Sequence, residues 1–252
     1  MISKFGKKPA RRDARTLRFG AILNPATIPP LPERYDFDDA HPEVPNPLFG
    51  NDAHPNCVIA GRAHQTLRFE LSEEGALPTI TEDDVNEEWR RQCGGVDEGL
   101  VLLDSLKLWR SPGWSVAGRN YRIKAFALVD PTDVARMKTA IYLLDGVGLG
   151  LALPISVTRD FEDPTLWSVP SDPGLAEKDS RGGHYVLLTG YDETGPVGVT
   201  WGRKQSMTWE FVARYADEAY AVVDGVDQWL GARSPINAKA LVDYLQVVGT
   251  MM

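Results

Sequence analysis

The residue best suited to covalent chemistry is Cys57, together with the polar segment that leads into it. Apolar side chains recur every three or four positions over 57–71, which predicts an amphipathic helix that begins near the cysteine. The first turn of a helix offers unpaired N–H groups and the positive end of the helix dipole, and both lower the pKa of a thiol. We therefore expect a reactive Cys57 that is alkylated in preference to Cys93. The turn formers of 50–56 can supply hydrogen-bond donors to an oxyanion.

His184 is the second residue of interest, because it stands at the head of a short apolar run behind Gly182 and Gly183. The run predicts a strand, and the two glycines allow another stretch of chain to approach closely. A lone histidine in a strand is usually structural. His184 follows Cys57 by 127 residues, however, close to the separation of about 130 to 150 found in one group of cysteine nucleophiles and their histidine bases.

Several further segments match, in order, those of the papain-like cysteine peptidases, and the resemblance spans 31–223. They are 31–36 (Leu-Pro-Glu-Arg-Tyr-Asp), 92–95 (Gln-Cys-Gly-Gly), 184–191 and 199–202 (Val-Thr-Trp-Gly, where the family reads Asn-Ser-Trp-Gly). The resemblance implies an α+β, papain-like two-lobe fold, in which an N-terminal helical lobe with the cysteine helix packs on an antiparallel β-sheet lobe. It also implies that Cys57 is the nucleophile, His184 its base, and Asn51 the residue in the position of the oxyanion-hole glutamine.

The chain departs from this family at two positions that matter for catalysis. Val199 occupies the place of the asparagine that orients the histidine, and valine cannot hydrogen-bond to an imidazole. Thr200 is the nearest replacement and Gln205 another, and the sequence leaves the choice open. Asn51 is one methylene shorter than glutamine, and the charge of its neighbour Asp52 would repel an oxyanion.

The sequence is compatible with three functions. The first is a papain-like cysteine peptidase or amide hydrolase that uses a Cys57/His184 dyad on a peptide or protein substrate. The second is a catalytically impaired papain-like fold that acts as a structural or binding protein, such as a phage virion component. A looser resemblance to uncharacterised proteins of actinobacteria and their phages motivates it. The third is a peptidoglycan amidase, which shares the order of cysteine and histidine in a shorter domain. Whether the chain is an enzyme stays open.

Helices gather in the first half and strands in the second, which favours an α+β layout over alternating βαβ units. We expect an extended basic and proline-rich N-terminal arm over 1–45, a papain-like domain over 46–224, and a C-terminal helical extension over 225–252 that packs on the domain. The expected helices are 57–71, 81–93, 96–109, 132–144 and one near 238–245, and the expected strands are 121–129, 148–155, 184–191, 197–201 and 219–223.

The composition limits the class of protein and the cellular compartment to which the chain can belong. The chain has 252 residues, of which 43% are hydrophobic and 25% charged, and its net charge is −8, as expected of a folded globular protein. The acidic body disfavours nucleic-acid binding, and the longest apolar runs are too short for a membrane helix. With two cysteines and no metal-ligand spacing, we expect no disulfide, no metal and no cofactor. These features predict a cytoplasmic protein, or a virion protein if phage-encoded.

The basic N-terminal segment is the one strong departure from this acidic character. It carries seven lysines and arginines, namely Lys4, Lys7, Lys8, Arg11, Arg12, Arg15 and Arg18. Such a segment is usually solvated, and it can also bind an assembly partner through its charge. Only about 30 residues precede the papain-like segments, so we do not expect latency imposed by a long inhibitory prosegment.

Overall fold

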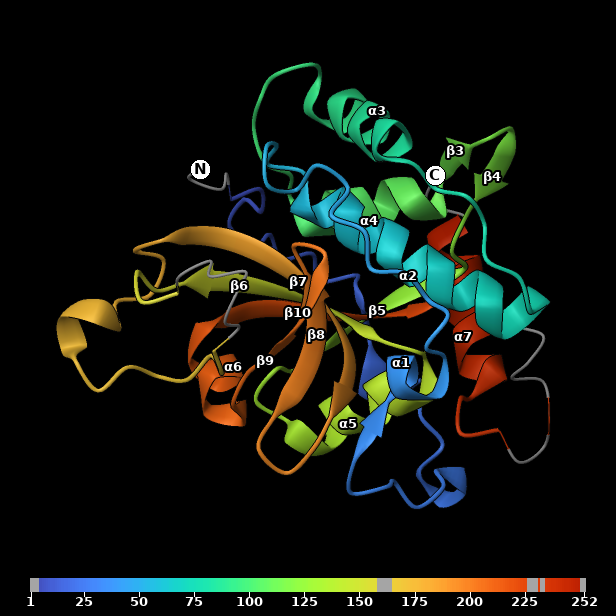
Figure 1. The fold of residues 1–252 in the computed structure, drawn as a ribbon. Helices are drawn as coiled ribbons and strands as arrows, with labels where there is room; N and C mark the ends of the chain where they lie inside the picture. Colours follow the sequence, from blue (N-terminus) through green and yellow to red (C-terminus); the bar gives the residue numbers. More distant parts are fainter. Residues whose placement is uncertain (1–4, 158–164, 226–230, 232–233, 250–252) are drawn as a thin grey trace.

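A large sheet and a group of helices lie against each other in the computed structural model, which describes residues 5–157, 165–225, 231 and 234–249 (Figure 1). The helical lobe contains α2 (Cys57–Glu74), α3 (Glu82–Cys93) and α4 (Leu102–Arg110). Four other helices are α1 (Phe37–Ala40), α5 (Val134–Leu143), α6 (Trp209–Tyr215) and α7 (Ala238–Gly249). The two-lobe α+β prediction is confirmed.

The main sheet runs in the order β1–β5–β10–β6–β7–β8–β9, with β2 added at one end of β7. Its strands are β1 (Leu17–Arg18), β2 (Tyr35–Asp36), β5 (Ala125–Val129), β6 (Val147–Leu153), β7 (Gly182–Tyr191), β8 (Pro196–Thr200), β9 (Arg203–Ser206) and β10 (Ala216–Val223). The described pairings between strands of this sheet are antiparallel except that of β1 with β5. A separate hairpin joins β3 (Trp114–Val116) to β4 (Arg119–Tyr121).

Strand β7 lies between the two hydrophobic cores and supplies side chains to both. Val186 and Leu188 point into the core shared with α5, α6 and α7, whereas Tyr185 and Leu187 point into the core of the helical lobe. This alternation follows from the period of two in a strand. Since both faces are covered, β7 reads as a continuous apolar run, and it holds its residues rigidly between the lobes.

Helix α2 crosses the sheet beside β7 and is buried over most of its length (Figure 1). Close packing is possible because Gly61 faces the ring of Tyr185, and a Cβ at that position would overlap the ring. The helix ends at Gly75, whose φ of 66° is the left-handed conformation that favours glycine. The packing therefore fixes the first residue of α2, Cys57, relative to β7.

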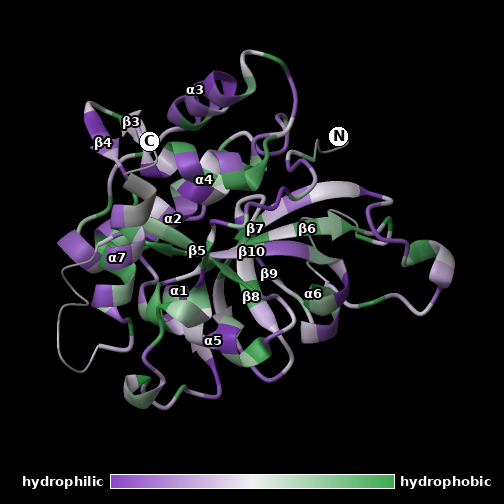
Figure 2. Ribbon diagram, turned by 180° about the vertical axis from the view of Figure 1, so that it is seen from behind, coloured by the Kyte–Doolittle hydropathy of each residue, from purple (hydrophilic) through white to green (hydrophobic). Residues whose placement is uncertain are grey.

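Helix α3 lies on the outside of the helical lobe and is largely hydrophilic in Figure 2. The predicted start at Thr81 is confirmed, because the Thr81 hydroxyl accepts from the N–H of Asp84 while the Asp84 carboxylate accepts from the N–H of Thr81. The helix ends before Gly94, as predicted. Val85 and Trp89 anchor it to the core.

Two predicted elements were wrong in extent. The helix expected over 96–109 begins only at Leu102, because the backbone of Leu100 is extended and hydrogen-bonds to the N-terminal segment. The strand expected over 121–129 is two strands, since β4 ends at Tyr121 in a hairpin packed around Trp114 and the main sheet resumes at Ala125. Strand β9 and helix α6 were not predicted, although Thr208 caps α6 by accepting from the N–H of Phe211.

Both ends of the described chain pack on the fold. The segment before residue 45 contains little regular structure, as expected, but β1 pairs with β5 and β2 pairs with β7. Leu241 of α7 is fully buried in the core that α5 and α6 also line. The domain boundaries at 45 and 225 remain predictions. Among the described residues, no helix is long and apolar enough to cross a membrane.

Candidate active site

Cys57 is the first residue of α2, as its spacing predicted. Asn56 caps the helix, because its backbone carbonyl accepts hydrogen bonds from the N–H groups of Ile59 and Ala60. Its side-chain amide donates to the carbonyl oxygen of Phe49 and to the side-chain oxygen of Asn86. The cap therefore ties the start of α2 to the preceding turn and to α3. Cys57 is 2% exposed.

The sulfur of Cys57 lies where α2, β7 and the N-terminal segment meet. Backbone N–H groups of Tyr185, Gly6 and Val58 lie near enough to the sulfur to favour its thiolate form. Tyr185 directly follows His184 on β7, so the fold brings the helix start to the strand position that carries the histidine.

Burial raises the pKa of the Cys57 thiol to about 11, against the attraction of these N–H groups and of the Lys7 ammonium. The expected depressed pKa was therefore wrong for this conformation. The reason is that a helix N-terminus stabilises a thiolate by a modest amount, whereas complete removal from water penalises the charge more strongly.

His184 is fully buried near the start of β7, and two side chains of the adjoining strand end hold its ring. Its Nε2 lies 2.6 Å from the hydroxyl oxygen of Thr200, the last residue of β8. The indole of Trp201 stacks on the imidazole, with centroids 4.2 Å apart and planes inclined by 21°. The ring of Phe5 meets the imidazole edge-on at 5.7 Å. The histidine thus has a fixed orientation.

The contact with Thr200 distinguishes between the two residues considered for orienting the histidine. The amide of Gln205 donates instead to the carbonyls of Thr165 and Ser206, 2.7 and 2.9 Å away. Val199 is buried in β8. Of the two candidates, Thr200 is therefore the one whose side chain contacts His184.

Asn51 is buried close to the start of α2, where its amide nitrogen donates to the side-chain oxygen of Asn56 at 3.0 Å. An asparagine amide has two N–H donors, so this bond uses one of them. Its assignment to an oxyanion hole stays a prediction. Asp52 is half-buried in the same turn.

Residues 5–8 of the N-terminal arm run through the site as an extended segment. The Lys7 N–H donates to the carbonyl of Gly183 at 3.1 Å. On the other side, the Leu100 N–H donates to Gly6 and the Lys8 N–H donates to Leu100, each at 2.8 Å. The segment is therefore hydrogen-bonded along both of its edges, in the manner of a strand.

Glycines make this close approach possible. A Cβ on Gly6 would overlap the carbonyl of Pro55, one on Gly99 would overlap the carbonyl of Gly6, and one on Gly183 would overlap that of Lys7. The prediction that the Gly182 and Gly183 pair admits another stretch of chain is confirmed. The arm was expected to be solvated or to bind a partner, and its first described residues instead cover Cys57 and His184.

Sequence reasoning missed Phe5, Gly6 and Lys7, and gave Trp201 no role. The available signal was the glycine pair before His184, which indicated an approaching chain without indicating which one. A basic arm in an acidic protein was the second signal, because opposite charges attract.

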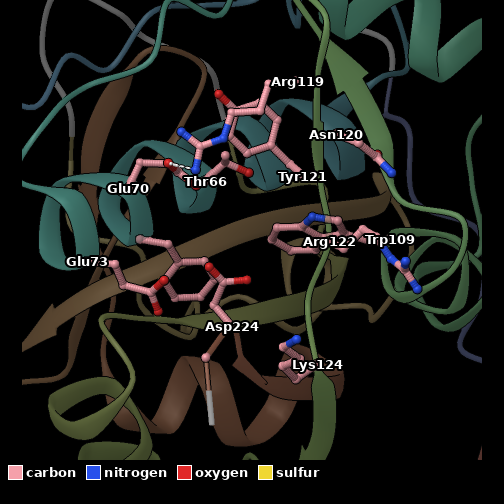
Figure 3. Close-up of a pocket in the computed structure, with 12 residues that line it drawn as sticks. Thr66, Glu70, Glu73, Trp109, Arg119, Asn120, Tyr121, Arg122, Lys124 and Asp224 are labelled. Atoms are coloured by element: carbon pink, nitrogen blue, oxygen red, sulfur yellow. Dashed lines mark ion pairs between the residues drawn. The ribbon is translucent and has the colours of Figure 1, made fainter. Parts of the chain in front are cut away.

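A hollow of about 290 Å³ lies away from this site, between the C-terminal half of α2 and the chain that leads into β5. Figure 3 shows Glu70, Glu73 and Asp224 on one side of it and Arg122 and Lys124 on the other. Burial and the charges of Glu73 and Glu70 raise the pKa of Asp224 to about 7. Neither Cys57 nor His184 lines this hollow.

The second thiol belongs to Cys93, the last residue of α3. Cys93 is free and half-buried, so it is more exposed than Cys57. Its Sγ lies 3.6 Å from the carbonyl oxygen of Arg90. Within the described ranges, no group of three or more His, Cys, Asp or Glu side chains could hold a metal ion.

A cysteine at the start of a helix beside a histidine strand, between a helical lobe and a sheet lobe, defines the papain-like fold, and this chain adopts it. It is similar to xylellain, a cysteine protease from Xylella fastidiosa, with a TM-score of 0.69 and 18% identity over 89% of this chain and 97% of that one.

Two other solved structures share the fold at lower similarity. Procathepsin B from Trypanosoma congolense has a TM-score of 0.59 and 12% identity, covering 88% of this chain and 86% of its own. A Carica candamarcensis cysteine protease in complex with E-64 has a TM-score of 0.58 and 12% identity, covering 77% and 100%. No protein-family model and no curated protein sequence matches the chain.

Proposed function

We propose that this protein is a papain-like cysteine peptidase or related amide hydrolase that uses Cys57 as nucleophile and His184 as general base. The observation that carries the proposal is that an extended peptide segment already lies over Cys57 and His184, hydrogen-bonded on both edges. A site that binds backbone in this way suits a peptide or protein substrate. The neighbouring structures named as cysteine proteases support the same reaction class.

In the proposed reaction, His184 takes the proton of the Cys57 thiol and the sulfur attacks the carbonyl carbon of the scissile amide. The carbonyl electrons move onto oxygen and return as the C–N bond breaks, while the imidazolium gives its proton to the leaving amine. Water, deprotonated by His184, then attacks the thioester, releasing the acid and restoring the thiol.

Stabilisation of the two oxyanions falls to the N-terminus of α2. The first N–H groups of a helix have no partner within the helix, and the positive end of its dipole favours a negative oxygen there. The Cys57 backbone N–H is the proposed main donor. Asn51 would add a second donor with the amide N–H that it does not give to Asn56.

Thr200 and Trp201 are the proposed positioning residues of His184. If Nε2 carries the proton and donates it to Thr200, then Nδ1 is the basic nitrogen. Trp201 covers the ring and keeps this hydrogen bond away from water. The arm must leave before a substrate enters, so the described conformation is the inactive one.

The test is hydrolysis of a fluorogenic peptide-amide library by the full chain and by its Gly6→Ala variant. The added methyl would overlap Pro55 and displace the arm, so the variant should hydrolyse substrates at least about tenfold faster than the parent. Gly231→Ala is the matched control, because no atom of the described residues lies within 4 Å of a Cβ at that position.

Cys57→Ser in the Gly6→Ala background should abolish hydrolysis. If the Gly6→Ala chain hydrolyses no member of the library although its arm is displaced, the peptidase proposal is wrong. The role as a structural or binding protein then takes its place.

A further inference from the structure

The hollow beside Asp224 is lined by charges of both signs, and some of them already neutralise each other. The Arg119 guanidinium lies 2.8 Å from a carboxylate oxygen of Glu70 and 2.6 Å from one of Glu74. Its central carbon also lies 5.1 Å from the centroid of the Tyr121 ring. Arg119 and Glu70 therefore form one end of the hollow as a closed ion pair (Figure 3).

Glu73 and Asp224 form the negative side of the hollow. Burial and the charge of Glu74 raise the pKa of the Glu73 carboxyl. Burial and the charges of Glu73 and Glu70 raise that of Asp224, as described above. Carboxyls that repel each other in this way keep their charge more easily beside a cation. This side of the hollow therefore suits an ammonium group.

Lys124 lies on the positive side of the hollow, directly across from Asp224. Its N–H donates to the carbonyl of Val223 at 2.9 Å, which continues the pairing of β5 with β10 and sets the two side chains opposite each other. The Lys124 charge attracts Glu73 and Asp224, but no ion pair joins it to either of these described residues. Opposite charges therefore face each other across the hollow without closing on each other.

Two further hydrogen-bond donors lie on the side of Lys124. Arg122 donates through Nε to the carbonyl oxygen of Arg110 at 3.2 Å, which uses one of its five N–H groups. Trp109 also lines the hollow and is 3% exposed, and its indole N–H has no hydrogen-bond partner among the described residues. Figure 3 shows this indole beside Arg122, across the hollow from Glu73. Because buried donors are rarely left unpaired, this one indicates where a ligand oxygen would lie.

We propose that this hollow binds a small zwitterion, a free amino acid or dipeptide, with its ammonium group at Glu73 and Asp224 and its carboxylate at Lys124. Arg122 and the Trp109 N–H add donors to that carboxylate. A zwitterion compensates both sides of the hollow, whereas a simple cation or anion compensates only one. The volume of about 290 Å³ lies at the small end of ligand pockets, which begin at about 300 Å³, and so suits a ligand of this size.

Three matched peptides test the recognition of both charges by the full-length chain. Glycylglycine carries both charges at pH 7, N-acetylglycylglycine lacks the ammonium group, and glycylglycinamide lacks the carboxylate. In isothermal titration calorimetry, glycylglycine should bind at least about tenfold more tightly than either blocked peptide, because each of these leaves one side of the hollow uncompensated. Equal affinities for the three peptides, or no binding of glycylglycine, would overturn the proposal.

Two double variants test whether the binding takes place in the hollow. Glu73→Gln/Asp224→Asn should reduce the preference for glycylglycine over N-acetylglycylglycine to about twofold or less, and leave its preference over glycylglycinamide unchanged. Arg122→Gln/Lys124→Met should do the reverse, because it removes the groups that receive the carboxylate.

Glu193→Gln and Lys239→Met are the controls, because both side chains are exposed and neither lines the hollow. They should keep the affinities of the parent chain. Preferences that survive both double variants would mean that the peptide binds elsewhere, and would overturn the proposal. The readout is binding alone and the hollow lies away from Cys57, so the result does not depend on the proposed peptidase reaction.

Discussion

At the scale of single residues, the proposed site combines a restrained base with a concealed nucleophile. Thr200 and Trp201 hold the imidazole of His184 in place. The N-terminal arm covers Cys57, and burial raises the pKa of its thiol. The same residues can therefore be inert or reactive, depending on whether water and substrate reach the sulfur.

Replacing Thr200 by valine keeps the shape of the side chain and removes the oxygen that meets His184. In the Gly6→Ala background, Thr200→Val should slow alkylation of Cys57 at pH 6 to 7 by about tenfold or more, because the tautomer of the base is no longer fixed. Thr200→Ser, which keeps the hydroxyl, should restore most of the rate. Equal rates for the valine and serine variants would contradict a positioning role.

The positions of Cys57 and His184 in the fold could be predicted from the sequence because their signals are local. Cys57 begins a helical apolar pattern, and His184 lies at the head of a strand. The pKa of Cys57 could not be predicted, because it depends on Gly6 and Lys7, fifty residues away, and on the burial that they cause. The partner of His184 was ambiguous because a shift of one residue along β8 exchanges the face that a side chain occupies.

At the scale of elements, the site exists because glycines let three segments pass within hydrogen-bonding distance of one another. The arm runs between Gly183 of β7 and the extended segment around Leu100 that precedes α4. That extended segment is the reason why α4 starts later than its helical pattern predicted, since the arm uses the backbone of Leu100.

Gly99→Ala and Gly183→Ala should each displace the arm, because the new methyl would overlap a carbonyl of Gly6 or Lys7. Trypsin should then cleave between Lys7 and Lys8 at least about tenfold faster than in the parent chain, since cleavage follows the population of the open form. The two variants act from opposite edges of the arm, so a shared result cannot come from damage to β7 alone.

The control for both variants is Gly231→Ala, whose added methyl would contact none of the residues that the structure describes. Unchanged cleavage in both glycine variants would mean that the arm does not depend on this close approach.

At the scale of the whole molecule, charge is distributed to favour the closed form. The basic arm lies on an acidic body, and Lys7 compensates buried carboxylates on β10. The two-lobe fold itself was predictable from the order of helices and strands. The path of the arm was not, because its contacts join residues that are distant in sequence and its proline-rich composition indicates only an extended chain.

The hollow beside Asp224 makes global stability depend on pH. The folded pKa of Asp224, about 7, exceeds its unfolded value of 3.8, so the folded state retains a proton that the unfolded state loses. The stabilisation is complete below pH 3.8 and disappears as the pH rises through 7. Asp224→Asn should therefore raise the melting temperature relative to the parent by several degrees more at pH 9 than at pH 4.

Glu193→Gln, which alters an exposed carboxylate, is the control for this measurement. If the difference in melting temperature between Asp224→Asn and the parent is the same at pH 4 and pH 9, the carboxyl does not carry the proposed proton.

Alkylation by iodoacetamide between pH 5 and 9 shows whether Cys57 and His184 form a reactive pair beneath the arm. In the parent chain Cys93 should react first, because it is the more exposed thiol and burial raises the pKa of Cys57. In Gly6→Ala, Cys57 should react rapidly below pH 7, and His184→Ala in that background should remove this reaction. A Cys57 that stays inert in Gly6→Ala, or that reacts equally with and without His184, would mean that the two residues do not form a reactive pair.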